Sequence, residues 1–94
     1  MTRSIRIDYS NKFSKQLKKI PLEIKIAFRN RFSLFIKNQF NPILNNHALS
    51  GNLKGYRSIN ITGDWRAIYS ENTDKDGKKY IIFELFGTHS QLCK

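Results

Sequence analysis

The spacing of apolar residues changes at Asn41-Pro42, and this change limits the folds that the chain can adopt. Before this point, apolar residues recur at the spacing of a helix: Ile24, Phe28, Phe32, Phe35 and Ile36. After it, apolar residues alternate with polar ones or form the short runs that are typical of strands. The sequence therefore predicts a helical first half and a sheet in the second half.

Two helices are predicted in the first half. Ser10 can cap the first helix, in which Phe13 and Leu17 share one face. Pro21 ends this helix and suits the first turn of the second, which we expect to span Leu22–Phe40. Because the link between them is so short, the two helices are expected to form an antiparallel hairpin.

Four strands are predicted, one before the helices and three after them. The first is Ser4–Asp8, and the later three are Tyr56–Thr62, Asp64–Ser70 and Lys79–Gly87. Thr62-Gly63 leaves room only for a tight hairpin, and Asp76-Gly77 supplies the residue with positive φ that the second hairpin needs. The predicted fold is α+β, in the order β-α-α-β-β-β, with an antiparallel sheet covered on one face by the helical hairpin.

Glu84 interrupts the last strand, which is otherwise apolar at nearly every position. Such a run indicates a central strand that is buried on both faces. A carboxylate in this setting needs a partner. We expect Arg57 or Arg66, on the neighbouring strands, to supply it.

The net charge of +10 is extreme for a chain of 94 residues, in which 17 Lys and Arg accompany 7 Asp and Glu. A field of this strength favours a polyanionic partner, most often nucleic acid. No apolar run approaches the roughly 20 residues that cross a bilayer, and the start MTRSIRIDYS lacks the apolar stretch of a signal peptide. We therefore expect a single cytoplasmic domain, residues 1–94, without membrane contact.

Metal binding is not expected either. The chain has 2 His and 1 Cys, whereas a structural zinc site uses four ligands, mostly Cys and His. Without a second thiol, Cys93 cannot form an internal disulfide. We expect a protein with no metal and no cofactor.

One face of the sheet should stay partly open, because one helical hairpin cannot cover both faces. Alternation along the second of the three later strands places Trp65, Ala67 and Tyr69 toward the helices, and Asp64, Arg66 and Ile68 away from them. His89 follows the last strand, and His47 lies in the loop before the sheet. Cleavage of RNA without metal requires a base for the ribose 2′-OH, a cation for the phosphate and an acid for the leaving oxygen. These residues could provide all three groups.

Each of these residues also has a structural interpretation. A lone surface histidine is more often structural than catalytic, and an arginine beside a tryptophan more often packs or pairs. Trp65 alone is more often part of a core than a platform for a base. The case for nucleic acid therefore depends on the combination of these residues with the net charge.

Several sequence stretches, spread over nearly the whole chain, match a known pattern. They are "FSKQLKKI", "NP" at the end of the second helix, "HALSG", "KGYRSINITGDWRAIY" and "FGTHSQL". In these the chain resembles toxins of the RelE/ParE superfamily from bacterial type II toxin–antitoxin systems, and the YafQ type most closely. The resemblance implies a helical hairpin on a sheet and a ribosome-dependent endonuclease that acts on mRNA in the ribosomal A site. It also implies neutralisation by a cognate antitoxin.

The resemblance assigns roles to individual residues. His47 matches the loop histidine of the family, Asp64 its hairpin aspartate, Trp65 the tryptophan that follows, and His89 its C-terminal histidine. Arg66 matches the strand arginine that other RelE-like branches use on the scissile phosphate.

Three positions depart from the YafQ-type pattern. Asn60 stands where the family has a second histidine, Leu85 where it has an arginine, and Cys93 where an aromatic residue is expected to stack on a base. We infer that Arg66 takes over the task of the missing arginine. The departures are compatible with a weaker or differently selective nuclease, and also with a toxin that has lost cleavage.

The preferred hypothesis is an mRNA interferase. In it, His89 is the general acid, Asp64 or His47 is the base, and Arg66 contacts the phosphate. RNA is expected to bind at Lys54, Arg57, Asn60 and Trp65. The alternatives are a ParE-type poison of DNA gyrase on the same fold, and an RNA-binding toxin without cleavage. The retention of His47, Asp64 and His89 argues against the gyrase poison.

Overall fold

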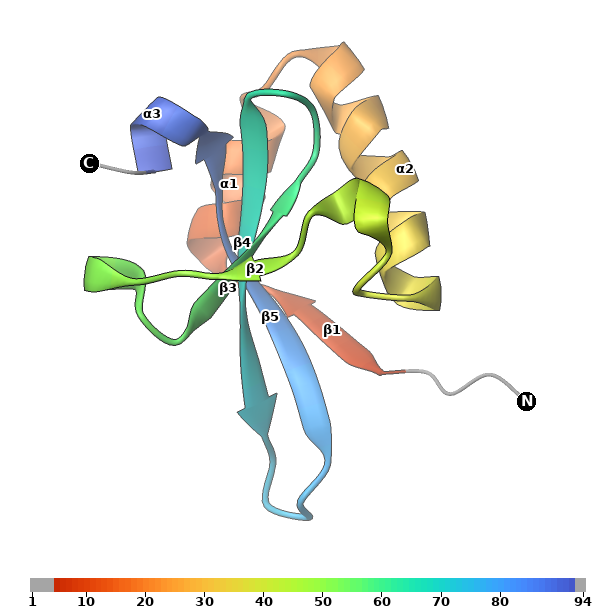
Figure 1. The fold of residues 1–94 in the computed structure, drawn as a ribbon, viewed down its shortest axis with the longest axis vertical. Helices are drawn as coiled ribbons and strands as arrows, with labels where there is room; N and C mark the ends of the chain where they lie inside the picture. The colour runs from red at the N-terminus through yellow and green to blue at the C-terminus, as the bar shows by residue number, and fades with distance from the viewer. Residues whose placement is uncertain (1–4, 93–94) are drawn as a thin grey trace.

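A five-stranded β-sheet with the strand order β1-β5-β4-β3-β2 carries the fold (Figure 1). The structure is a computed structural model and describes residues 5–92 of the chain. The strands are β1 (Arg6–Tyr9), β2 (His47–Ala48), β3 (Tyr56–Asn60), β4 (Trp65–Thr73) and β5 (Lys79–Thr88). The helices are α1 (Asn11–Lys18), α2 (Leu22–Lys37) and α3 (His89–Leu92), with 3₁₀ turns η1 (Pro42–Leu44) and η2 (Gly51–Leu53). The predicted α+β class is confirmed, and β2, α3 and the 3₁₀ turns are added to the predicted order.

The prediction of a purely antiparallel sheet needs one correction. The strands β3, β4 and β5 form the expected antiparallel meander. However, β1 runs parallel to β5, with Ile7 opposite Ile81. The chain leaves β1 through α1 and α2 and returns through the meander, so that β5 lies beside β1 in the same direction (Figure 1). The residues of β1 do not encode the direction of this distant neighbour.

Helices α1 and α2 cover one face of the sheet with an aromatic core. Phe13 of α1 and Phe35 of α2 are buried against Phe83 of β5, with ring centroids 5.5 Å and 5.3 Å from that of Phe83. Burying one such side chain fully contributes about 1.5–3 kcal/mol, so this layer provides the largest favourable contribution to folding. The remaining buried members are Phe28, Leu44, Ile59, Ile61, Ala67, Tyr69, Ile81 and Phe86.

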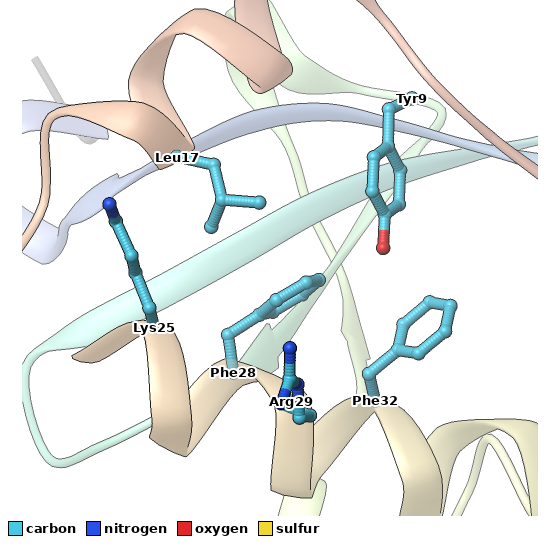
Figure 2. A pocket seen from close by; sticks show the side chains of 6 residues that line it. All are labelled: Tyr9, Leu17, Lys25, Phe28, Arg29 and Phe32. Carbon is cyan, nitrogen blue, oxygen red and sulfur yellow. The ribbon is translucent and has the colours of Figure 1, made fainter. Parts of the chain in front are cut away.

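A cavity of about 310 Å³ remains at the edge of this layer, between α1, α2 and the end of β1 (Figure 2). Its lining consists of Tyr9, Leu17, Lys25, Phe28, Arg29 and Phe32. The hydroxyl of Tyr9 points toward the aromatic rings of α2, and Lys25 and Arg29 stand on the same helix (Figure 2). The cavity therefore combines an apolar floor with basic side chains.

α2 ends at Lys37, earlier than the predicted end at Phe40. Asn38 has an extended backbone, with φ −161° and ψ 103°. Its side-chain Oδ1 accepts a hydrogen bond from the amide of Phe40 at 3.0 Å. Asparagine side chains compete in this way with the backbone hydrogen bonds of a helix. The helix therefore stops at Asn38 instead of continuing to the following Asn-Pro pair.

A β-bulge in β5 changes which residues face the helices. Ile68 of β4 pairs with Leu85, whereas the next residue, Tyr69, pairs with Phe83, so Glu84 is the extra residue. Strand residues two apart normally share a face, but here Phe83 belongs to the core and Leu85 lies on the other side with Ile68. The end of β5 therefore reaches the face away from α1 and α2, called the open face below, in a register that simple alternation does not give.

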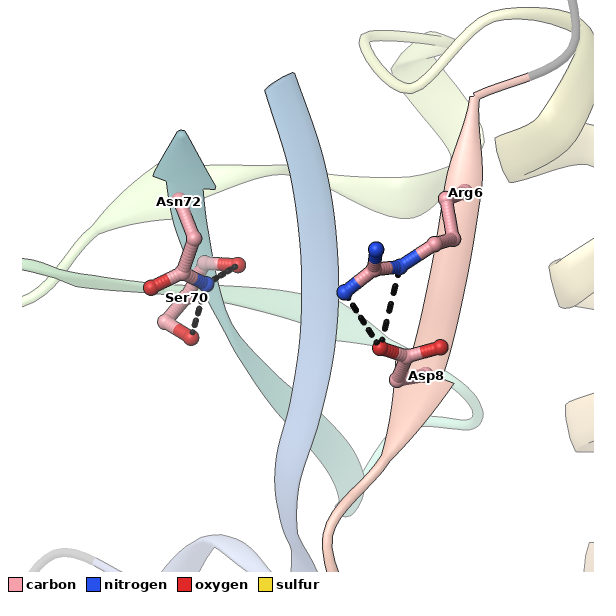
Figure 3. A network of polar contacts seen from close by, with 4 residues as sticks. All are labelled: Arg6, Asp8, Ser70 and Asn72. Carbon is pink, nitrogen blue, oxygen red and sulfur yellow. Dashed lines mark hydrogen bonds and ion pairs between the residues drawn. The ribbon is translucent and has the colours of Figure 1, made fainter. Parts of the chain in front are cut away.

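Glu84 is paired with neither Arg57 nor Arg66, contrary to the prediction. Its Oε2 accepts a hydrogen bond from Oγ of Ser70 at 2.8 Å. Ser70 Oγ in turn accepts one from Nδ2 of Asn72 at 3.0 Å (Figure 3). The bulge brings the carboxylate beside Ser70, while Arg57 and Arg66 donate their hydrogen bonds to other groups.

Ion pairs contribute little to this fold. Within residues 5–92, one pair of opposite charges lies at ion-pair distance. It joins Nη2 of Arg6 to Oδ2 of Asp8 at 3.1 Å, on the edge strand β1 (Figure 3). An exposed pair of this kind contributes about 0–1 kcal/mol. Most of the net charge of +10 is therefore uncompensated at the surface. In the same part of the chain, every helix is too short or too polar to cross a membrane.

Candidate active site

Residues in the middle of the open face are buried, whereas residues at one corner of it are accessible. Ser58 and Ile68 are only 3% and 2% exposed, although both point away from α1 and α2. Asn60 and Arg66, further toward the end of the sheet, are half-buried, and Asp64 is exposed. This corner consists of the turn between β3 and β4 and the end of β5. We call it the site corner.

Three of the predicted catalytic residues come together at the site corner. Arg66 lies opposite Gly87 of β5 in the strand register, and the turn that carries Asp64 directly precedes β4. The amide of His89 donates a hydrogen bond of 2.9 Å to the carbonyl oxygen of Asp64. This bond ties the end of β5 to the turn. The predicted acid, one of the two predicted bases and the predicted phosphate ligand are thereby neighbours.

Arg66 is held by the turn beside it. Its Nη1 donates to the carbonyl oxygens of Thr62, Gly63 and Trp65 at 3.2, 3.1 and 3.2 Å. Within the described residues, Nε and Nη2 donate to no protein acceptor. An arginine has five N–H donors in a fixed planar arrangement. One side of this guanidinium is therefore fixed by the turn, and the other side is left for an anionic ligand.

His47 also reaches the open face, from the sheet edge. The sequence placed it in a loop, but it begins the short strand β2 and pairs with Ser58, two residues before Asn60 on β3. Its ring is exposed, and Nδ1 lies 2.9 Å from the carbonyl oxygen of Asn45. Since a carbonyl oxygen can only accept, the hydrogen bond assigns the proton of the neutral ring to Nδ1. Nε2 is then free to accept a proton.

Asn60 presents an unused hydrogen-bond acceptor at the site corner. It lies opposite Arg66 in the strand register. Its Oδ1 is buried and has no hydrogen-bond partner among the described residues. Buried polar atoms nearly always have partners, from protein, water or ligand. A bound molecule would reach this acceptor only after the Asn60 side chain turned outward.

Three residues that the sequence assigned to RNA binding lie elsewhere. Arg57 pairs with the core residue Tyr69 and so faces the helices, where its Nε donates to Oδ1 of Asn46 at 2.7 Å. Trp65 also faces the helices, with its ring 5.7 Å from that of Phe86. Lys54 is exposed in the loop before β3, at the opposite end of that strand from Asn60. Arg57 could have been placed correctly from sequence, because it alternates with the outward Ser58.

Leu85 occupies the open face where the family pattern has an arginine. It is half-buried and pairs with Ile68, so an apolar patch replaces a cation at the centre of this face. Cys93, the other departure near the C-terminus, lies outside the described residues. Arg66 is thus the arginine on the open face that stands beside His89.

The sequence analysis missed α3 and the two residues that close it. Thr88 and Gln91 bond to each other's backbone amides across the first turn of α3. The signal was present, because Thr-x-x-Gln has the spacing of a capping box. His89 is the first residue of this helix, and its ring is exposed.

The site corner therefore holds a histidine, a carboxylate and a half-free guanidinium on the surface of a basic protein. These groups can move protons and stabilise a phosphate. Among residues 5–92, no three of the His, Cys, Asp and Glu side chains gather in a way that could hold a metal ion.

Comparison with known proteins identifies the family. The model of a family described as "Bacterial toxin of type II toxin-antitoxin system, YafQ" matches residues 5–94. This chain belongs to the YafQ family. It is 33% identical over 90 residues to the mRNA interferase toxin YafQ of Escherichia coli strain K12, and the alignment covers 92% of each chain.

Solved structures of YafQ share the fold of this YafQ-family toxin. The crystal structure of YafQ from Escherichia coli strain BL21(DE3) matches with a TM-score of 0.72 at 31% identity, over 96% of this chain and 99% of that one. YafQ in the Escherichia coli DinJ-YafQ toxin-antitoxin complex matches with a TM-score of 0.67 at 29% identity, over 98% and 100% of the two chains. The resemblance seen in the sequence is confirmed by both.

Proposed function

We propose that this YafQ-family toxin is a ribosome-dependent endoribonuclease that cleaves mRNA in the ribosomal A site. The observation that carries the proposal is the hydrogen bond from the His89 amide to the Asp64 carbonyl oxygen. This bond joins the backbones of an acid candidate and a base candidate, each two residues along the chain from the Arg66–Gly87 pair. The name of the Escherichia coli relative, an mRNA interferase, supports the same chemistry.

The reaction that suits these groups uses the substrate's own nucleophile. A base removes the proton of the ribose 2′-OH, and the 2′-oxygen attacks the adjacent phosphorus. The free donors of Arg66 stabilise the charge on the phosphoryl oxygens in the transition state. His89 gives a proton to the 5′-oxygen as its bond to phosphorus breaks. The products are a 2′,3′-cyclic phosphate and a 5′-hydroxyl, and no metal is needed to generate the nucleophile.

Two residues are candidates for the base. Asp64 is exposed in the turn beside Arg66. His47 presents a free Nε2 from the sheet edge. Asn60 lies between them, because β3 separates β2 from β4 in the sheet. Its buried Oδ1 has no partner among the described residues and would accept a hydrogen bond from the RNA if the side chain turned outward. Lys54 is exposed and can contact the RNA backbone further along the sheet.

The proposal includes a cognate antitoxin as partner. A solved relative is a DinJ-YafQ toxin-antitoxin complex. The cavity beside α2 supports this part of the proposal, since Lys25 and Arg29 suit carboxylates while Phe28 and Phe32 suit apolar side chains (Figure 2). Burial raises the pKa of the Tyr9 hydroxyl above its ordinary value, and this hydroxyl can donate a hydrogen bond to a carboxylate. An acidic antitoxin segment with apolar residues fits this lining, and the protein would act where ribosomes translate, in the cytoplasm.

The test is to add the purified toxin to a translating extract and to analyse the mRNA fragments. We expect cleavage within codons at the A site, fragments with 5′-hydroxyl ends, and cleavage that persists when EDTA is added up to the limit that the ribosome tolerates. Fragments with 5′-phosphates would contradict the mechanism. Intact mRNA together with inhibited DNA gyrase would replace the proposal by the ParE-type alternative. Intact mRNA with retained ribosome binding would indicate a toxin without cleavage.

A further inference from the structure

Residues Gly87–Leu92 form a closed segment at the end of β5, and His89 lies inside it. The amide of Thr88 donates to Oε1 of Gln91 at 2.8 Å, and the amide of Gln91 donates to Oγ1 of Thr88 at 3.3 Å. This reciprocal pair is a capping box, which satisfies two backbone donors that a helix start leaves free. His89 and Ser90 are the two residues that the box encloses.

A helix as short as α3 depends on such contacts. Its four residues, His89–Leu92, are far fewer than the 12 or so that an isolated helix needs to be even marginally stable. Leu92 is half-buried and lines a cavity of about 390 Å³ together with Ile20, Trp65 and Phe86. The capping box thus closes the start of α3, and Leu92 packs at its end.

Gly87 allows this segment to close. A Cβ at this position would lie 2.9 Å from Oε1 of Gln91 and 3.4 Å from the side chain of Leu92. The first distance is too short for a Cβ contact, so the Gln91 side chain would be pushed out of its bond to Thr88. The absence of a side chain at Gly87 therefore leaves the space that the Gln91 side chain needs to form the box.

The backbone of His89 is held while its ring is free. The box fixes Thr88, just before His89, and Gln91, two residues after it. The amide of His89 itself donates to the carbonyl oxygen of Asp64. The imidazole is exposed. This arrangement fixes the backbone from which the ring projects and leaves the ring unburied, which suits a group that must meet a bound substrate.

We propose that Gln91, acting with Thr88, is a positioning residue that holds His89 over the site corner. The inference rests on the proposed function, in which His89 protonates the leaving oxygen. Gln91 does not touch the RNA in this account. Its loss lowers the fraction of molecules in which α3 is docked, and the cleavage rate falls with that fraction.

The experiment compares matched variants in single-turnover cleavage on programmed ribosomes. Gln91→Ala and Thr88→Val remove one half of the box each, while Gln91→Glu and Thr88→Ser keep its hydrogen bonds. Loss of a cap typically corresponds to about a fivefold change in a local helix equilibrium. We expect a five- to tenfold lower maximal rate for the first pair, an unchanged half-saturating ribosome concentration, and activity close to wild type for the second pair. The second pair is the matched control, since each of its members changes a side chain and keeps the bond. Ser90 is left unchanged, because its Oγ lies 3.4 Å from Oγ1 of Thr88.

A double-mutant cycle with His89→Gln separates positioning from general damage. If Gln91 acts through His89, Gln91→Ala should cost nothing more once the imidazole is gone. A purely structural role would lower the rate by the same factor in both backgrounds, and that result would overturn the proposal. So would full activity of Gln91→Ala in the wild-type background.

Hydrogen exchange gives a readout that does not need activity. We expect the His89 amide to exchange faster in Gln91→Ala than in wild type, because its bond to Asp64 opens when α3 undocks. If wild-type protein cleaves no mRNA, the proposed function fails, and the exchange rate still decides whether Gln91 holds His89. An unchanged exchange rate would overturn the positioning role itself.

Discussion

The face of the sheet under α1 and α2 is lined by aromatic and aliphatic side chains, whereas the open face carries Asn60, Arg66 and Ser70. Both faces are built from the same three strands. On one face Tyr69 and Phe83 are 0% exposed, and on the other the residues become accessible toward the site corner. The hydrophobic core and the candidate active site therefore lie on opposite faces of the same three strands.

The β-bulge at Glu84 makes this separation possible within β5. Without it, Leu85 would follow Phe83 into the core, and Gly87 would face the helices. With it, Leu85 and Gly87 lie on the open face opposite Ile68 and Arg66, and the chain leaves the sheet at His89. A bulge that redirects side chains at a site is a recurrent use of this irregularity. The comparison of the two faces predicts that mutations should affect either folding or cleavage.

The largest effect is expected for His89→Gln. Loss of a general acid lowers a rate by about 10²–10⁴-fold. Because the ring is exposed and packs against nothing in the core, the urea midpoint should stay at the wild-type value. Cleavage on programmed ribosomes measures the loss of rate, and urea unfolding of the free toxin measures the stability. An active variant would remove His89 from the mechanism.

Phe83→Ala should have the opposite profile. Truncating a fully buried phenylalanine costs about 3–5 kcal/mol of unfolding free energy, a large part of the stability of a small domain. Leu85→Ala is the matched control, since it lies two residues away on the open face and is only half-buried. Its cost in a urea titration should be clearly smaller. Equal costs for the two variants would contradict the assignment of faces by the bulge.

A smaller effect is expected for Ser70→Ala, a polar residue of the open face that serves the fold. The substitution removes the donor to the Glu84 carboxylate, which is half-buried. Leaving such a group without its partner costs about 1–3 kcal/mol. Glu84→Gln in the same background should recover part of this cost, because an amide is easier to bury than a charge. Cleavage per folded molecule should not change, and a selective loss of cleavage would make Ser70 part of the site.

The helical and strand patterns were sufficient to predict the fold class. Phe13 was placed on the apolar face of the first helix, and Ala67 and Tyr69 toward the helices, from periodicity alone, and all three are buried. The end of α2 was wrong because the side chain of Asn38 competes for backbone hydrogen bonds, which periodicity does not report.

The bulge explains the wrong partner predicted for Glu84, and the other errors have separate causes. Alternation along β5 gives no sign of an extra residue, so Glu84 was expected to face an arginine, and it binds Ser70 instead. The parallel pairing of β1 is likewise a property of the whole topology. For the site, the motifs indicated Asp64, Arg66 and His89, and the structure brings them to one corner, but their roles in cleavage stay a prediction. Arg57 was assigned to RNA binding, and its pairing with Tyr69 puts it on the helix face, as alternation along β3 indicates.

Within residues 5–92 the fold has one ion pair, between Arg6 and Asp8, and this scarcity has a consequence for the stability of the folded toxin. In a chain with a net charge of +10, folding brings many cations together and few of them meet an anion. Their mutual repulsion opposes the compact state, and added salt screens it. The free toxin should therefore gain stability with ionic strength, unlike a protein that relies on surface ion pairs. The two partners proposed above, an acidic antitoxin and the ribosome with its phosphates, would relieve the same repulsion, so binding of either would stabilise the folded state.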